Sequence, residues 1–136
     1  MINGPDITAR QYAFRAIRAA VPLTIAVETK PRTNGAVPYV FVGPSDLSEH
    51  PVNFDIRLTI DVWSNKEGDV ECKQVQHAIR TALDGLTHVD TTESISPNNS
   101  WRFTLVYEEL CRATFEAGNS VWHGVQRFRI LAEDMA

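Results

Sequence analysis

The sequence has few cysteines, no excess of basic residues and no long apolar run, and each deficit removes a class of protein. Only two of its 136 residues are cysteine, Cys72 and Cys111. That is too few for a disulfide framework, so we expect two reduced thiols. The longest mostly apolar run, 19–27, is interrupted by Pro22 and Thr24 and is too short to span a bilayer. The first residues lack the basic start and apolar stretch of a secretory signal, so we expect a soluble protein made in the cytoplasm.

Basic residues are also scarce relative to acidic ones. The formal net charge is −4 at pH 7, which disfavours a protein whose whole surface binds nucleic acid. Arginines gather in only two segments, 10–18 and 127–129. The 43% hydrophobic and 22% charged residues are typical of a globular protein, and the length suits one domain. We therefore expect a single domain spanning residues 1–136.

Sequence motifs that carry chemistry are missing as well. The chain has no phosphate-binding G-x-x-x-x-G-K-[ST] loop, no dinucleotide glycine cluster, no H-E-x-x-H and no paired C-x-x-C. Its four histidines lie on separate predicted elements: His50, His77, His88 and His123. We therefore predict no catalytic residue, no cofactor and no metal ion, and a protein that is not an enzyme.

The two cysteines and a pair of glutamates need separate consideration. Cys72 and Cys111 fit small core residues better than nucleophiles, because unpaired cysteine is usually buried. A zinc site built from both cysteines and His77 is disfavoured, because His77 and Cys72 point to different faces of one predicted helix. Glu108 and Glu109 are adjacent in a predicted strand and point to opposite faces, so they do not form an acid–base pair.

Two segments, 6–20 and 70–83, have the apolar spacing of helices. The first begins with an aspartate and the second follows one, and each aspartate can act as the N-cap; a residue that ends helices comes after each segment. These cap and stop residues are Asp6 and Pro22 for the first helix, and Asp69 and Gly85 for the second. On the second helix we place Gln76 and His77 on the polar side.

The clearest strand pattern covers 54–63, where apolar and polar residues alternate strictly. Asp55 and Asp61 fall on its polar face and are expected to be solvated surface. Shorter strands are predicted at 23–28 and 37–42. The polar segment that follows, 45–53, is predicted to be a loop.

Two long strands are predicted near the C-terminus. The first, 101–117, loses its alternation at Glu108 and Glu109, which indicates a bulge. The second starts at Ser120, extends to Leu131 and carries apolar residues on both faces, so it is either central in the sheet or covered by another subunit. Between the helix at 70–83 and these strands, the polar segment 87–100 predicts turns, with a short strand near Val89.

Together the elements predict an α+β fold with a mainly antiparallel sheet of about four to five strands. Two principal helices should pack on one face of that sheet.

Five large or basic residues are candidates for an interface. The tryptophans could stack on the bases of single-stranded nucleic acid, but the acidic balance favours packing in a core or an interface. Two arginines share a strand with Trp122 and face away from it. The candidate interface residues are Trp63, Trp101, Trp122, Arg127 and Arg129.

Four stretches, in their order and spacing, resemble one known family. They are Ile60–Ser64, Ala78–Gly85, His123–Arg129 and Pro38–Gly43. The chain is similar to the tail-completion, or tail-terminator, proteins of long-tailed phages and of gene transfer agents. The resemblance extends from about residue 38 to 131, and the segment 94–100 departs from the family pattern.

The resemblance implies a structural virion protein at the head-proximal end of the tail. Such a protein forms a ring, expected to contain six copies, that ends polymerisation of the tail tube and joins the tail to the head connector. Its implied partners are further copies of itself, the tail tube protein, the head–tail connector or stopper protein, and DNA that passes through the lumen without sequence-specific binding. It is made in the host cytoplasm, and no membrane is involved.

Physical arguments are compatible with this function but leave others open. A closed ring needs two different complementary patches on each subunit, and an acidic lumen would let DNA slide, which is a hypothesis. One alternative is a head–tail adaptor, another neck component or a minor tail protein. A small nucleic-acid-binding domain or a small enzyme is a further alternative.

Overall fold

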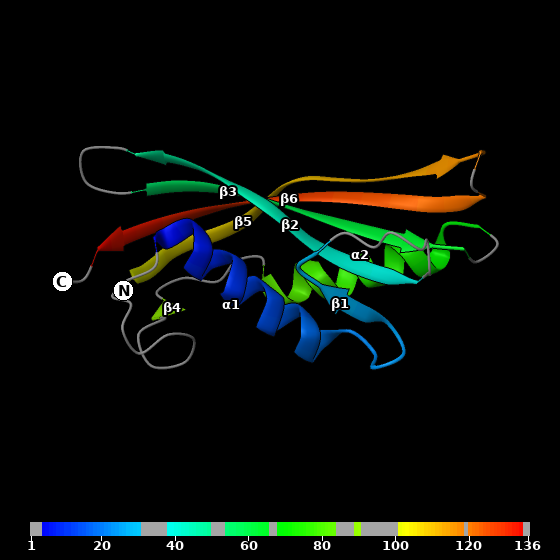
Figure 1. Cartoon of the computed structure of the whole chain (residues 1–136), viewed down its shortest axis with the longest axis horizontal. Helices are drawn as coiled ribbons and strands as arrows, with labels where there is room; N and C mark the ends of the chain where they lie inside the picture. Colours follow the sequence, from blue (N-terminus) through cyan, green and yellow to red (C-terminus); the bar gives the residue numbers. More distant parts are fainter. Residues whose placement is uncertain are drawn as a thin grey trace.

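The computed structural model describes residues 4–30, 38–49, 54–65, 68–83, 89–90, 101–118 and 120–134. Within them, two helices lie on one side of a six-stranded sheet (Figure 1). The elements are α1 (Pro5–Ala20), β1 (Ala26–Glu28), β2 (Tyr39–Glu49), β3 (Phe54–Ser64), α2 (Val70–Leu83), β4 (Val89–Asp90), β5 (Trp101–Glu116) and β6 (Val121–Asp134). The sheet order is β1-β2-β3-β6-β5-β4, and only β1 and β2 pair in parallel. The predicted α+β class, with a mainly antiparallel sheet, is confirmed.

Helix α1 starts one residue earlier than predicted and without the predicted cap. Gly4 is the N-cap, no side chain caps the helix, and Pro5 occupies the first turn. Pro5 suits this position because its missing N–H would have no partner in a first turn. The prediction that Asp6 is the N-cap is wrong. Asp6 lies inside the first turn instead, where its carboxylate still faces the positive end of the helix dipole.

Arg10 interrupts the apolar face of α1 because it links three elements. Its Nε donates to the carbonyl of Val42 at 3.1 Å, and its Nη2 donates to the carbonyl of Thr29. Ala9, Ala13 and Ile17 on the same helix are fully buried. The arginine therefore attaches α1 to β2 and to the end of β1 without entering the core.

Helix α2 has the predicted bounds. The carbonyl of Asp69 accepts the first helical hydrogen bond, from the N–H of Lys73 at 3.0 Å, as expected of an N-cap residue. The prediction that Gln76 is on the polar side is wrong, since Gln76 is only 2% exposed. Its amide donates to the carbonyl of Arg112 on β5 at 2.9 Å, so the buried group has a partner. The predicted stop, Gly85, lies outside the described residues.

Strand β2 is longer than predicted. The prediction of a loop at 45–53 is wrong for residues 45–49, which belong to the strand. The register between β2 and β3 shifts between Val42 and Ser45, and the pairing then continues to Glu49. The Gly43–Pro44 step is thus a bulge and not an end. A bulge accommodates Pro44, which lacks an N–H for the ladder. A side chain at Gly43 would approach the carbonyl of Thr59 to 2.8 Å.

Three other predicted segments lie partly outside the described residues. These are the turn at 30–35, the rest of the predicted loop at 50–53 and most of the polar segment 87–100. Inside the last segment, β4 pairs with Arg102 and Phe103, which confirms the predicted short strand.

Strand β6 is central in the sheet, which is the first of the two explanations given for the apolar residues on both of its faces. It pairs with β3 on one side and with β5 on the other, antiparallel in both cases. The pairing of β5 with β6 shifts between Glu108 and Leu110, so the predicted bulge is confirmed.

The core lies between the sheet and the two helices (Figure 1). Its largest fully buried side chains come from both layers: Phe103, Phe128, Ile17, Ile56, Leu58, Ile60, Ile79, Leu83 and Ile130. A glycine brings α2 close to the centre of the sheet. A Cβ on Gly124 would lie 2.5 Å from Nε2 of Gln76 and 2.7 Å from Sγ of Cys72. The close approach of α2 to β6 therefore requires glycine at this position.

We predict that Gly124→Ala lowers the free energy of unfolding by about 1–3 kcal/mol, because the added methyl group overpacks this contact. Urea unfolding followed by circular dichroism measures the change. Gly118→Ala is the matched control, since a Cβ there meets no atom within 4 Å. Equal unfolding midpoints for Gly124→Ala and the unmodified protein would contradict the packing argument.

Candidate subunit interface

The face of the sheet opposite to α1 and α2 is covered by no helix or strand among the described residues (Figure 1). We call it the open face. Its side chains alternate with the core residues along three adjacent strands. They include Asp55, Arg57, Thr59, Asp61 and Trp63 on β3, His123, Val125, Arg127, Arg129 and Leu131 on β6, and Tyr107, Glu109 and Arg112 on β5.

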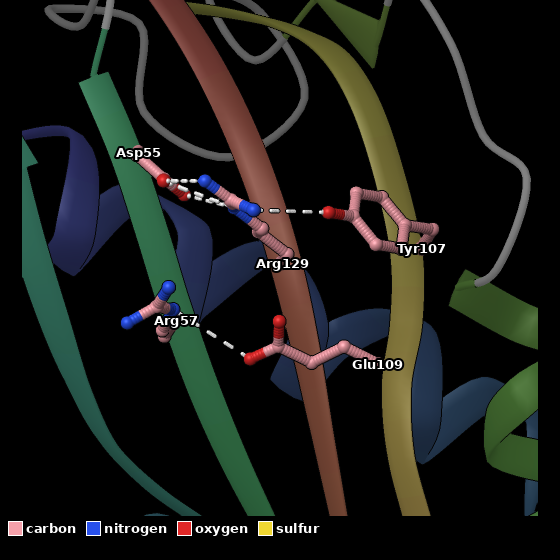
Figure 2. Close-up of polar contacts among 5 residues, drawn as sticks. All are labelled: Asp55, Arg57, Tyr107, Glu109 and Arg129. Carbon is pink, nitrogen blue, oxygen red and sulfur yellow. Dashed lines mark hydrogen bonds and ion pairs between the residues drawn. The ribbon is translucent and has the colours of Figure 1, made fainter. Parts of the chain in front are cut away.

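A row of three polar side chains crosses the open face from β3 over β6 to β5 (Figure 2). Nε of Arg129 donates to both carboxylate oxygens of Asp55 at 2.9 Å, and its Nη2 donates to Oδ2 as well. Nη1 of Arg129 donates to the hydroxyl oxygen of Tyr107 at 3.3 Å. The hydrogen bonds to Asp55 raise the pKa of Arg129, so the guanidinium stays charged.

Asp55 is only 6% exposed, so the prediction that it is solvated surface is wrong. A buried carboxylate needs a charged partner to offset its lost hydration, and the arginine of the neighbouring strand supplies one. Asp61 is likewise hydrogen-bonded, to Nε2 of His123 at 2.8 Å.

A second ion pair connects β3 and β5, the two strands on either side of β6. Nε of Arg57 on β3 lies 3.6 Å from Oε1 of Glu109 on β5, so this ion pair also passes over β6 (Figure 2). The Arg57 side chain is 52% exposed, and such a pair contributes little stability in water. The bulge at Glu108–Leu110 allows Glu109 to point to the open face while Glu108 points to α2.

Three rings are stacked side by side across the open face. The ring centroids of Tyr39 and Trp63 are 5.0 Å apart, and those of Trp63 and His123 are 4.3 Å apart. The planes are nearly parallel, at 13° and 8°. The stack follows from the register, which aligns the three residues on β2, β3 and β6.

His123 is held between two carboxylates. Besides the contact with Asp61, its Nδ1 lies 3.2 Å from Oε1 of Glu116 on β5. The hydrogen bond to Asp61 and the nearby negative charges raise the pKa of His123, although burial opposes them. When the imidazole is protonated, both of its N–H groups have an acceptor.

The other polar cluster lies between α2 and the sheet. Nε2 of Gln126 donates to Oε2 of Glu108 at 2.8 Å and to the carbonyl of Gln76 at 2.9 Å. Arg80 donates to the second oxygen of Glu108 at 2.9 Å. This network joins α2 to β5 and β6.

The two thiols and the acidic and histidine side chains of the described residues bear on the possible chemistry of the chain. Burial raises the pKa of Cys72 to about 11 and also raises that of Cys111, so neither thiol ionises readily near neutral pH. No group of three or more His, Cys, Asp or Glu residues able to hold a metal occurs among the described residues. In the same part of the chain, neither helix is long and apolar enough to cross a bilayer.

The five candidate interface residues are divided between the two faces. Trp63 and Arg129 are on the open face and partly exposed, and Arg127 is on it and exposed. Trp101 is 9% exposed and packs edge-on against Phe54, with ring centroids 5.3 Å apart. Trp122 is on the helix side, partly buried, 5.4 Å from the ring of Phe115. As predicted, Arg127 and Arg129 face away from Trp122.

The partners of Trp63 and Arg129 were not identified from the sequence. Asp55 and Asp61 share the polar face of β3 with Trp63, and this alternation was the only local signal. The pairing of that face with the polar face of β6 depends on a register between segments about 70 residues apart in sequence.

A comparison with protein families shows to which family the chain belongs. The family described as "Tail completion protein gp17" matches residues 5–133. The chain belongs to this family. The tail completion proteins are structural components of the virion, so the resemblance predicted from the four stretches is confirmed, and the virion tail is the location of the protein.

A solved structure shares the fold of this tail completion protein. A chain in a structure titled "Virion of native gene transfer agent (GTA) particle" superposes with a TM-score of 0.67 at 20% sequence identity. The match covers 94% of this chain and 95% of that chain. No curated protein matches the chain.

Three of the four family-like stretches meet in the stack on the open face. Tyr39, Trp63 and His123 come from the stretches at 38–43, 60–64 and 123–129, respectively. The fourth stretch supplies Arg80 of the network below α2. Three segments that are far apart in the sequence of this tail completion protein thus meet on the open face, and the fourth contacts β5 from the helix side.

We predict that the stabilisation contributed by His123 depends on pH. Because its folded pKa is raised above about 6.5, the contribution is complete below that pH and is lost as the pH rises through the folded value. The decrease in melting temperature caused by His123→Gln should be large at pH 6 and small at pH 9. Thermal unfolding from pH 5.5 to 9 measures it, with exposed His77→Gln as the control. A difference that stays constant over this range would contradict the prediction.

Proposed function

We propose that the chain is the tail terminator subunit of a long-tailed virion or gene transfer agent. Copies of it form a ring, of six subunits, on the head-proximal end of the tail tube. The ring ends polymerisation of the tube and joins the tail to the connector or stopper protein below the head. The observation that carries this proposal is the family match, which extends over 5–133 and so includes nearly all described elements.

The physical features of the fold support a scaffold role. The polar side chains of the open face are engaged in ion pairs and stacking across strands, an arrangement that fixes the shape of a surface. The exposed guanidinium of Arg127 lies in the middle of this surface. We propose that Arg127, together with Trp63 and Arg129, belongs to the surface that contacts the neighbouring virion protein.

The proposed ring leaves a central passage for DNA. The protein has a formal net charge of −4, and a passage lined by an acidic protein repels the phosphate backbone. DNA would then slide through the ring without sequence-specific binding.

Deleting the gene and imaging the particles tests the proposed function. We expect tails of uncontrolled length, because no subunit caps the growing tube, and full heads that lack tails. The control is the same strain with the gene supplied in trans.

Two other outcomes would contradict the proposal. Tails of normal length beside full but tailless heads would indicate an adaptor of the neck instead of a terminator. Normal tails attached to normal heads would show that the protein has neither role.

The contact surface is tested by reversing one charge. We expect Arg127→Glu to weaken the joining of tails to heads about tenfold or more, because reversed charges at an interface are strongly unfavourable. Counting complete particles by electron microscopy measures the effect. Lys73→Glu, at an exposed position of α2 on the other side of the sheet, is the matched control and should assemble normally. If Arg127→Glu folds and assembles normally, the part of the open face around Arg127 is not a contact surface.

A further inference from the structure

The sheet has two edge segments that run in opposite directions and have no described strand beside them. On one edge, β1 pairs only with Tyr39–Phe41 of β2, so no described strand pairs with the outer side of Gly43–Glu49. On the other edge, β4 pairs only with Arg102 and Phe103, so no described strand pairs with the outer side of Leu105–Glu116. Unpaired edges of this length are templates for pairing with another chain.

The strand directions allow the β2 edge of one copy to pair with the β5 edge of another. From β2 to β5 the sheet contains three antiparallel steps, through β3 and β6, so β5 runs opposite to β2. When a second copy continues the sheet beyond β5 by rotation, its β2 arrives antiparallel to β5. Antiparallel strands are readily joined in this way.

The side chains of the two edges are complementary as well. Phe115 and Leu47 are 48% and 43% exposed, and the register places both on the helix side of the sheet. Asp46 on β2 and Arg112 on β5 are exposed and both lie on the open face. Joining the two edges would thus put apolar residues together on one side and opposite charges together on the other.

A cavity next to β2 could receive the aromatic residue. It measures about 610 Å³ and lies between the first half of α1 and the bulge of β2, on the helix side of the sheet. Ile7, Phe14 and Pro44 provide the apolar part of its lining, beside polar residues that include Asp6, Arg10 and Arg15, and Ile7 is 48% exposed. A phenyl ring entering from the adjacent edge would bury apolar surface on both partners.

We propose that the C-terminal half of β5 in one copy pairs antiparallel with Gly43–Glu49 of β2 in the next copy. Phe115 occupies the cavity between α1 and β2, and Asp46 lies near Arg112. The contact is heterologous, so its repetition by rotation gives a ring with a continuous sheet. This inference rests on the proposed function, since it identifies the contact between subunits of the proposed ring.

Photo-cross-linking tests the contact directly. Benzoylphenylalanine replaces Phe115, the purified chain is added to tail tubes of the same particle, and the sample is irradiated. We expect a covalent dimer whose cross-linked peptides contain 6–15 or 38–57 of the second copy. The same probe at Leu23, which is 91% exposed, is the control and should give no such dimer.

The outcomes separate this inference from the proposed function. Rings on the tubes with cross-links only between two β5–β6 hairpins, or only to the tube protein, would overturn the contact and leave the ring intact. A chain that stays solitary on the tubes would overturn both.

A charge exchange gives an independent readout that does not require the probe. Asp46→Arg and Arg112→Asp should each decrease ring occupancy on tubes about tenfold, and the double variant should restore most of it. Circular dichroism checks that each variant folds. A double variant that is no better than the single ones would overturn the predicted charge pair.

Discussion

The pairing of β6 on both sides is the constraint on which the rest of the structure depends. It is paired with β3 from Trp122 to Ala132 and with β5 from Val121 to Asp134. Because side chains alternate, this register places Gly124 and Gln126 under α2 and His123 and Arg129 on the open face. A slip by one residue would exchange these sets, putting the arginine into the core and the core side chains into solvent. The ion pair with Asp55 and the close approach of α2 are therefore consequences of one register.

Polar groups are used on both sides of this strand, but in different ways. Below α2, the amides of Gln76 and Gln126 are buried and donate to the backbone carbonyls of Arg112 and Gln76 and to the carboxylate of Glu108. Such groups are costly unless they find these partners, so they favour one arrangement of α2 over others. On the open face the pairs are partly exposed and stabilise less. Their effect there is to hold side chains of three strands in fixed positions, which is what a contact surface requires.

The sequence predicts those parts of the fold that depend on local patterns. Helix α2, strand β3 and the bulge near Glu108 all follow from apolar spacing and a break in alternation, and the apolar residues on both faces of β6 left its central position as one of two explanations. Two of the errors have one physical origin, because each depends on a partner remote in the sequence. Asp55 was assigned to the surface since its partner, Arg129, is 74 positions away. Gln76 was assigned to solvent since its partner is a carbonyl of β5.

The end of β2 shows a different kind of ambiguity. Gly43 and Pro44 are turn residues and also bulge residues, and local sequence does not distinguish the two uses. Pairing with β3 up to Phe54 decides in favour of the bulge. The candidate interface residues, Trp63, Arg127 and Arg129 among them, were chosen from the sequence by residue type alone. The sequence could not separate these three from Trp101, because the division between the two faces becomes visible only when the strands are aligned.

The two edges of the sheet also differ in the self-association that they permit. Pairing β2 with β2 of another copy would bring the Asp46 side chains of the two chains near each other. Pairing β5 with β5 would do the same for the two Arg112 side chains. Both arrangements place like charges near each other, whereas pairing β2 with β5 places opposite charges there. The exposed charges of the edges thus disfavour two-fold dimers and favour a head-to-tail contact.

A head-to-tail contact either closes into a ring or continues as a filament, and the rotation between neighbours decides which. The strands of the sheet cross diagonally in Figure 1, and in the proposed ring this twist would contribute to the rotation between neighbouring copies.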